Sequence, residues 1–195
     1  MNKIFYIMGK SASGKDTIYK SLVEKFPQLK TVVLYTTRPK REGEVDGVEY
    51  HFITPKKMQE FKADKKLIEI RGYHTTKGLW EYATIEDGQI DLESASYLMM
   101  GTLESYLKIK EYYGHEKVVP LYLEVPDVLR LERALNREKS QEIPDCQELC
   151  RRFLADCEDF SSEKLKEAGI TKSYKNEEVT NCIENIVGVI NDGRI

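Results

Sequence analysis

The stretch that decides the fold is "IFYIMGKSASGKDT", residues 4–17 of a chain of 195 residues. Its apolar start predicts a strand over 3–8, and the glycines lead through a tight turn into a helix predicted over 14–26. The spacing GxxxxGK is that of a P-loop, in which backbone N–H groups and the lysine surround a phosphate. The phosphate-binding residues predicted from this motif are Gly9, Lys10, Ser11, Ala12, Ser13, Gly14, Lys15, Asp16 and Thr17.

Asp16 stands where a P-loop usually has a serine or threonine that helps to hold Mg²⁺. A carboxylate next to phosphates is repelled unless a cation lies between them. We therefore interpret Asp16 as a direct or water-mediated Mg²⁺ ligand, to which Thr17 can add its hydroxyl. The alternative is a plain glycine-rich turn, but such a turn has no need of Lys15 beside Asp16. We expect the loop to be functional.

The overall composition limits the partners of the chain. Its 30 Lys+Arg and 33 Asp+Glu give a net charge of −3, so there is no global attraction for nucleic acid or an anionic membrane. No apolar run approaches the roughly 18 residues of a membrane span, and the apolar start is too short for a signal peptide. The four cysteines lack the spacing of a metal site or a disulfide framework, which predicts reduced thiols and a cytoplasmic location. Nothing in the pattern specifies an oligomeric state.

Strands and helices alternate along most of the chain. Strands are predicted at 30–35, 66–73, 79–85, 96–101 and 117–125, and helices at 56–63, 103–113, 126–137, 145–168 and 177–190. This order predicts an α/β fold, a parallel sheet with helices on both faces. Short strands with little helix interrupt this order between about 34 and 90. We therefore expect a single domain (1–195) with a core of 1–33 and 95–195 and an inserted lobe at about 34–90. The lobe is predicted to include a hairpin after residue 35, and a short lid is predicted at about 137–146.

A second cluster of charged residues is "YTTRPKREGEVDGVEYHF", residues 35–52. Arg38 and Arg41 flank the rigid Pro39, an arrangement that suits bidentate capture of a phosphate, although charge alone favours a solvated hairpin. The order TTR-x-x-R followed by GE-x-DG-x-E-Y-x-F resembles the acceptor lobe of the guanylate kinase family, at the same distance behind a P-loop. The resemblance implies that Arg38, Arg41 and Tyr50, with the neighbouring Thr37, hold the phosphate of an acceptor nucleotide.

The resemblance continues more weakly along the rest of the chain. It implies that Glu69 of "KLIEIRG" reads the guanine edge, and that Asn176 of "SYKNEE" lies beside the adenine. It also implies that Arg133, Arg137 and Arg152 close over the transferring phosphoryl group. Arg130 falls on the same helical face, where a catalytic role and a solvated basic face are equally favoured.

Three segments depart from the family pattern. Leu34 replaces a serine, Lys77-Gly78-Leu79 replaces a Tyr-Gly-Ser sequence, and Met100 and Thr102 replace a pair of aspartates at the end of a core strand. The phosphate-handling residues are therefore kept, while the predicted base-reading residues, which include Leu34 and Thr102, are altered. The lost strand-end carboxylate and the gained Asp16 are hypothesised to compensate for each other near the metal.

The resemblance implies an ATP-dependent nucleoside-monophosphate kinase that uses Mg²⁺ and phosphorylates GMP to GDP. The residues implied to be catalytic are Lys15, Arg38, Arg41, Arg133, Arg137 and Arg152. Two alternatives stay open: a kinase for another (deoxy)nucleoside monophosphate or a small phosphorylated metabolite, and an inactive, protein-binding module of the same fold. The retained Lys15 argues against the second.

Overall fold

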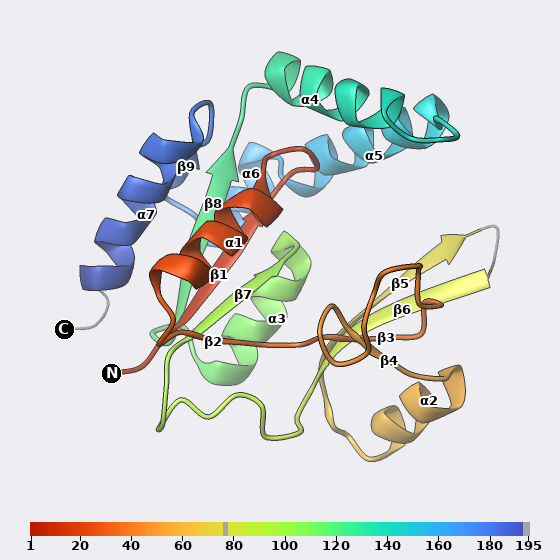
Figure 1. Ribbon diagram of the computed structural model, residues 1–195. Coiled ribbons are helices and arrows are strands. Elements are labelled where there is room, and N and C mark those ends of the chain that lie inside the picture. Colours follow the sequence, from red (N-terminus) through yellow and green to blue (C-terminus); the bar gives the residue numbers. More distant parts are fainter. Residues whose placement is uncertain (76–77, 193–195) are drawn as a thin grey trace.

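The computed structural model describes residues 1–75 and 78–192. Its core is a five-stranded, wholly parallel sheet with strand order β2-β7-β1-β8-β9 (Figure 1). The strands are β1 (Ile4–Gly9), β2 (Lys30–Thr31), β7 (Tyr97–Gly101), β8 (Val118–Glu124) and β9 (Ser173–Lys175). All residues of β1 are buried, as an apolar strand in the middle of a parallel sheet must be.

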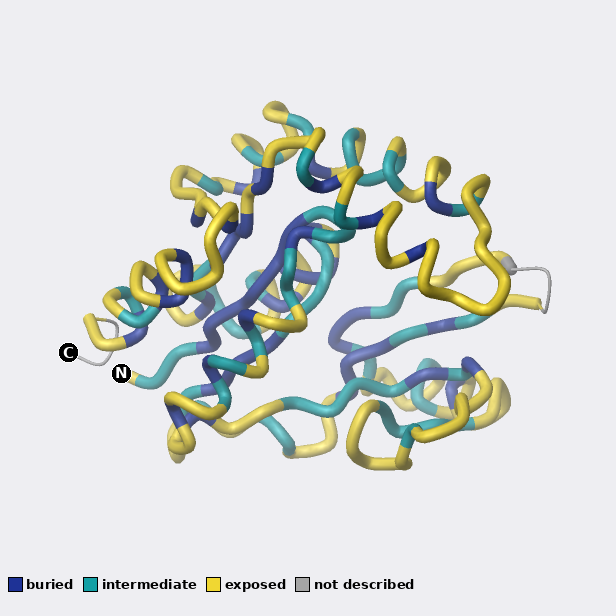
Figure 2. Tube along the Cα trace, turned by 45° about the horizontal axis from the view of Figure 1, so that its top comes forward, coloured by how far each residue is buried: buried dark blue, intermediate teal, exposed yellow. Residues whose placement is uncertain are grey.

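Helices cover both faces of this sheet. Phe5 and Ile7 face one core cluster with helices α1 (Lys15–Lys25) and α7 (Val179–Asp192). Tyr6 and Met8, which alternate with them, face a second cluster with α3 (Leu103–Tyr113) and α6 (Ser162–Glu167). The predicted α/β fold with helices on both faces is confirmed. Figure 2 shows the buried residues concentrated along the central strands.

A second, four-stranded sheet lies within the segment predicted as an inserted lobe. Its order is β4-β3-β6-β5, formed by β3 (Tyr35–Thr36), β4 (His51–Phe52), β5 (Leu67–Thr75) and β6 (Gly78–Ile85). Helix α2 (Pro55–Ala63) places Met58 against Ala83 and Ile85, which gives this sheet a small core of its own. Figure 1 shows the two sheets side by side, with α2 at the outer edge of the second.

Two strand predictions were wrong. The predicted strand over 30–35 pairs only at its ends: β2 joins the core sheet, whereas β3 joins the second sheet. The predicted hairpin does not form, because β4 pairs with β3 in parallel and the antiparallel partner of β3 is β6. Both errors concern pairing partners that are far apart in the sequence.

The long helix predicted over 145–168 is also divided. Helix α5 (Cys146–Asp159) ends at Phe160, whose ring is buried and stacks on that of Tyr122 at 5.7 Å. Ser161 then caps α6, because its Oγ accepts a hydrogen bond from the backbone N of Lys164. The helix therefore ends where the Phe160 ring is buried, although the helical spacing of apolar residues continues beyond it in the sequence.

Helices α4 (Asp127–Lys139) and α5 pack against each other above the carboxyl ends of the core strands (Figure 1). α4 extends to Lys139, into the segment predicted as a lid. Cys146, Cys150 and Cys157 recur at helical spacing, which predicts that they pack in the core. This prediction is wrong, because Cys146 and Cys150 are exposed and Cys157 is only half-buried. Within the described part of the chain, no helix is long and apolar enough to span a membrane.

Candidate functional site

The phosphate loop connects β1 to α1, and its two glycines are needed for different reasons. A Cβ on Gly9 would lie 2.7 Å from the carbonyl oxygen of Leu123 in the adjacent strand. Gly14 has a φ of 85°, in the left-handed region, and a Cβ there would lie 2.5 Å from the Nδ2 of Asn176. The loop therefore keeps the close backbone path that leaves its N–H groups at the helix N-terminus available to an anion.

Lys15 lies inside this loop. Its Nζ donates to the backbone carbonyls of Gly9, at 2.7 Å, and Lys10, at 3.0 Å. Burial lowers the pKa of Lys15, and the nearby carboxylates of Asp156 and Asp16 act in the opposite direction. The ammonium is thus held at the loop by carbonyl groups, in a position from which it can reach a bound phosphate.

Three arginines that are distant in sequence share a pocket with the loop. The pocket is lined by Ser11, Ala12, Gly14, Lys15, Asp16, Thr17, Arg133, Arg137 and Arg152. Four side chains in this set are cationic and one is anionic, so the pocket favours a polyanion. The structure thus brings together the arginines for which the sequence predicted a role in closing over a phosphoryl group.

The three arginines are held to different extents. Arg133 donates to the carbonyls of Asn176, at 2.9 Å, and Glu177, at 3.1 Å. Arg152 is 45% exposed and forms an ion pair with Glu148 at 3.2 Å. Arg137 is exposed and forms no ion pair within the described residues. Arg137 and Arg152 can therefore change position at little cost.

Asp16 and Thr17 are both exposed in the first turn of α1 and line this pocket. No group of three or more His, Cys, Asp or Glu side chains in the described part of the chain could hold a metal by itself. Mg²⁺ in nucleotide sites commonly uses one or two protein ligands and completes its coordination with phosphates and water. Asp16 and Thr17 fit this second mode.

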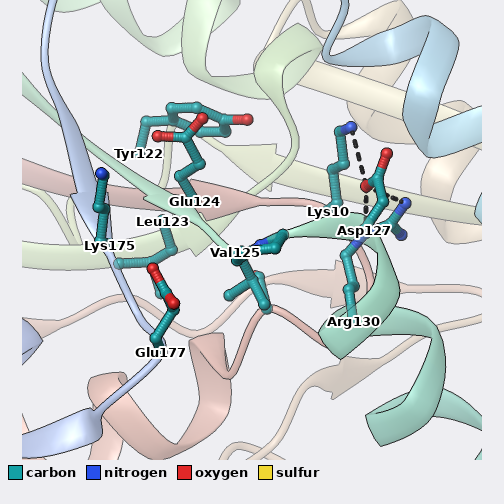
Figure 3. A pocket seen from close by; sticks show the side chains of 11 residues that line it. Lys10, Tyr122, Leu123, Glu124, Val125, Asp127, Arg130, Lys175 and Glu177 are labelled. Carbon is teal, nitrogen blue, oxygen red and sulfur yellow. Dashed lines mark hydrogen bonds and ion pairs between the residues drawn. The ribbon is translucent and has the colours of Figure 1, made fainter.

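Sequence reasoning missed a cluster that supports the loop from α4 and α5. The backbone N of Ser11 donates to Asp156 Oδ2 at 2.7 Å. Arg130 is 1% exposed and lies 3.4 Å from the same Asp156 oxygen and 3.0 Å from Asp127 Oδ1. Figure 3 shows Lys10 and Arg130 both directed at Asp127. Arg130 is therefore a buried structural cation. The sequence feature that could have indicated its ion pair is the spacing of Asp127 and Arg130, which lie three residues apart on one helix.

Asn176 does not have the surroundings expected of a residue that contacts adenine. Its side chain is fully buried, and its Nδ2 donates to the carbonyl of Ser13 at 2.7 Å. The amide therefore braces the phosphate loop, and the contact that this residue offers toward the pocket is its backbone carbonyl, bound by Arg133.

In the second sheet, Arg38 and Arg41 have different environments. Arg38 is 3% exposed, pairs with both carboxylate oxygens of Glu44 at 2.6 and 3.0 Å, and lies 5.5 Å from the centre of the Tyr50 ring. The hydrogen bond from Arg38 lowers the pKa of Glu44 to about 2. The side chain of Arg41 is exposed. Thr37 is occupied by the backbone of β6, because its Oγ1 accepts from the N of Glu81 at 2.9 Å.

Glu69, the predicted base-reading residue, is 4% exposed and has both oxygens engaged. Oε1 accepts from Thr84 at 3.0 Å, and Oε2 accepts from the Nε of Arg71 at 3.1 Å. Arg71 in turn donates to Thr102 Oγ1 at 3.3 Å. Burial raises the pKa of Glu69, against the opposing effect of Arg71. Arg71 was missed, although residues two apart on a strand share one face.

Leu34 packs its partly buried side chain against the core cluster on the α3 face. Of the altered segment 77–79, Lys77 lies outside the described residues, whereas Gly78 and Leu79 begin β6 and are exposed.

Comparison with known proteins gives a consistent result. Residues 1–87 match the family model described as guanylate kinase. The chain is 32% identical over 137 residues to the guanylate kinase of Helicobacter hepaticus, which covers 69% of this chain and 66% of that protein. It is 40% identical over 74 residues to the guanylate kinase of Mycobacterium tuberculosis, which covers 38% of this chain and 36% of that protein. The matches thus span less than two thirds of the length of these curated relatives.

The fold is similar to that of a crystal structure of guanylate kinase from Anaplasma phagocytophilum. The TM-score is 0.69 at 17% sequence identity, and the match covers 98% of this chain and 85% of that one. The similarity in structure therefore extends over β8, α4, α5 and α7, well beyond the matched N-terminal residues.

Proposed function

The chain belongs to the guanylate kinase family, and we propose that it transfers the γ-phosphoryl group of ATP to GMP, with ADP and GDP as products. An oxygen of the acceptor phosphate attacks the γ-phosphorus, and the bond from the γ-phosphorus to the β–γ bridging oxygen breaks. The observation that carries this proposal is the pocket in which Lys15 and the phosphate loop meet Arg133, Arg137 and Arg152.

Such a transfer needs positioning and charge neutralisation more than base chemistry, because a monophosphate is already an anion at pH 7. In the proposal, Lys15 and the loop N–H groups hold the β- and γ-phosphates. Arg137 and Arg152, which are the less constrained cations, move onto the transferring group and exclude water. Arg133 already spans from α4 to the backbone after β9, so it orders the pocket for the nucleotide.

We assign Mg²⁺ to Asp16 and Thr17, which fit a metal that is shared with phosphates. When bound, the ion would supply positive charge that offsets the negative charge of the phosphates during transfer. Asp16 would orient it from the helix N-terminus, and the exposed Thr17 hydroxyl would complete the protein's share of its ligands.

The acceptor phosphate is assigned to Arg38, Arg41 and Tyr50. Arg38 is the preorganised member, because Glu44 and the Tyr50 ring hold its guanidinium in place, whereas the exposed Arg41 is free to approach. Glu69 is assigned to binding of the acceptor's base, and the altered residues Leu34 and Thr102 are assigned to the surroundings of that base. The four free thiols support our proposal of a cytoplasmic location.

The test measures ADP formation from Mg·ATP with GMP, dGMP, IMP, AMP and UMP as acceptors. GMP is expected to be a substrate, and Lys15→Ala should lower its turnover by about a hundredfold or more through loss of phosphate charge stabilisation. Lys20→Ala is the matched control, since Lys20 is exposed on the same helix. Circular dichroism checks that both variants fold. Turnover of Lys15→Ala within a few-fold of wild type would reject the P-loop assignment, and the absence of turnover with any acceptor would reject the kinase assignment.

A further inference from the structure

Arg71 of β5 connects the two sheets beside the phosphate loop. Its Nη1 donates to Thr102 Oγ1 at 3.3 Å. Thr102 directly follows Gly101, the last residue of β7, and Gly101 pairs with Met8 just before Gly9 of the phosphate loop. Arg71 therefore lies at the carboxyl edge of the core sheet, where ligands of parallel α/β folds bind.

The guanidinium of Arg71 keeps a donor for a ligand. Its Nε is occupied by Glu69 Oε2 at 3.1 Å and its Nη1 by Thr102, whereas Nη2 has no hydrogen-bond partner among the described residues. The buried side-chain polar atoms that lack a partner in that part of the chain are Ser13 Oγ and Asn176 Oδ1. Nη2 is not one of them, so it reaches solvent although the Arg71 side chain is only 10% exposed.

Aromatic rings connect this donor with the acceptor-phosphate residues. The Tyr73 and Tyr82 rings lie 5.8 Å apart, and the Tyr82 and Tyr50 rings 5.6 Å apart. The Tyr50 ring lies 5.5 Å from the Arg38 guanidinium. The three rings thus form a continuous row of contacts that ends at the Arg38 guanidinium, and aromatic faces of this kind suit a planar base.

The pair presents an acceptor next to a donor. In a guanidinium, Nη2 lies on the same edge as the Nε–H group. Because Nε–H is bound to Glu69, the available Nη2 N–H lies beside the Glu69 carboxylate. A ring N–H next to a carbonyl group is complementary to this order, and guanine and hypoxanthine carry such an edge at N1–H and O6. Adenine presents the opposite order, an acceptor at N1 and a donor at its 6-amino group.

We propose that Arg71 is a specificity-determining residue of this site: it donates to O6 of a 6-oxopurine monophosphate, next to Glu69, which accepts from N1–H. This inference rests on the proposed kinase function. Thr84 and Arg71 already occupy Glu69, which leaves less acceptor capacity for a 2-amino group. IMP is therefore a substrate comparable with GMP, whereas AMP meets two mismatched contacts and is rejected.

The test compares steady-state kinetics of wild type, Arg71→Met and Lys57→Met with GMP, IMP, AMP and 6-thio-GMP, in which the weaker acceptor sulfur replaces O6. Lys57 is the matched control, since it is an exposed lysine in the same lobe, paired with Glu60. In wild type, kcat/KM for IMP should lie within about tenfold of that for GMP, and AMP and 6-thio-GMP should be poorer by about tenfold or more. Arg71→Met should raise the KM for GMP and IMP with little change in that for ATP.

The decisive readout is the penalty for replacing O6 by sulfur. This penalty should largely disappear in Arg71→Met and persist in Lys57→Met. The reason is that substitution of a residue changes the effect of the sulfur atom only if that residue contacts O6 in the wild type. An equal penalty in Arg71→Met and wild type, or an IMP that is poorer than GMP by more than about a hundredfold, overturns the proposal.

Two further measurements keep this test separate from folding and from the kinase assignment. If Arg71→Met does not fold, Arg71→Lys serves in its place, since it keeps the charge beside Glu69 but loses the paired donors. Calorimetric binding of GMP, IMP and AMP needs no turnover. Equal affinity for IMP and AMP would overturn the base assignment, even if phosphoryl transfer itself is observed.

Discussion

Asp16 is the single residue whose change from the P-loop pattern has the clearest chemical consequence. It is exposed in the first turn of α1, and it lines the phosphate pocket without forming an ion pair in the described residues. Asp16→Asn should raise the Mg²⁺ concentration needed for half-maximal activity by about tenfold, because one charged ligand is lost. Magnesium titration at fixed ATP measures this effect.

Asp16→Ser is the control for that experiment, since it restores the usual hydroxyl and should retain a lower Mg²⁺ requirement than Asp16→Asn. Neither change should alter the melting temperature, as the side chain is exposed. An unchanged Mg²⁺ requirement in Asp16→Asn would place the metal on other ligands.

At the scale of the elements, two of the three arginines on α4 have different roles. Arg130 is buried and tied to Asp127 and Asp156, whereas Arg137 is exposed and lines the phosphate pocket. Arg130→Met should lower the free energy of unfolding by about 1–3 kcal/mol, because it leaves carboxylates near the loop without their cation. Arg137→Met should leave stability unchanged and lower kcat.

Denaturant unfolding measures the stability of both variants, and the assay of ADP formation measures their kcat. The two variants lie on one helix and remove the same side-chain charge, so each is the control for the other. A loss of stability in Arg137→Met, or unchanged stability in Arg130→Met, would contradict the assignment of Arg130 to the support of the loop.

In the whole molecule, the cations that would meet the phosphates lie on three separate parts. Lys15 begins α1, which packs on the core sheet, Arg38 follows β3 of the second sheet, and Arg152 lies in α5. Like charges repel in the absence of a ligand, and a polyanion that contacts all three parts draws them together. An inhibitor that links two nucleosides through five phosphates should therefore reduce the radius of gyration more than ATP or GMP alone. Small-angle X-ray scattering measures this change, with Lys15→Ala as the control; equal radii in all ligand states would contradict closure.

The sequence by itself determined the elements whose signals are local. The apolar run of β1, the glycines of the loop and the spacing of Lys15 predicted the strand, the turn and the helix, because each depends on neighbours within a few residues. The motif around Arg38 and Tyr50 likewise pointed to the family that the comparisons confirm.

Only the tertiary structure decided which distant residues meet. The parallel pairing of β3 with β4 depends on contacts across the second sheet, and the end of α5 at Phe160 depends on burial against Tyr122. Arg130 and Arg71 look like ordinary surface cations in the sequence. Arg130 is buried and the Arg71 side chain is only 10% exposed, because partners supplied by other elements, Asp156 and Thr102, help to satisfy them there. A charge is tolerated in such surroundings only where partners converge.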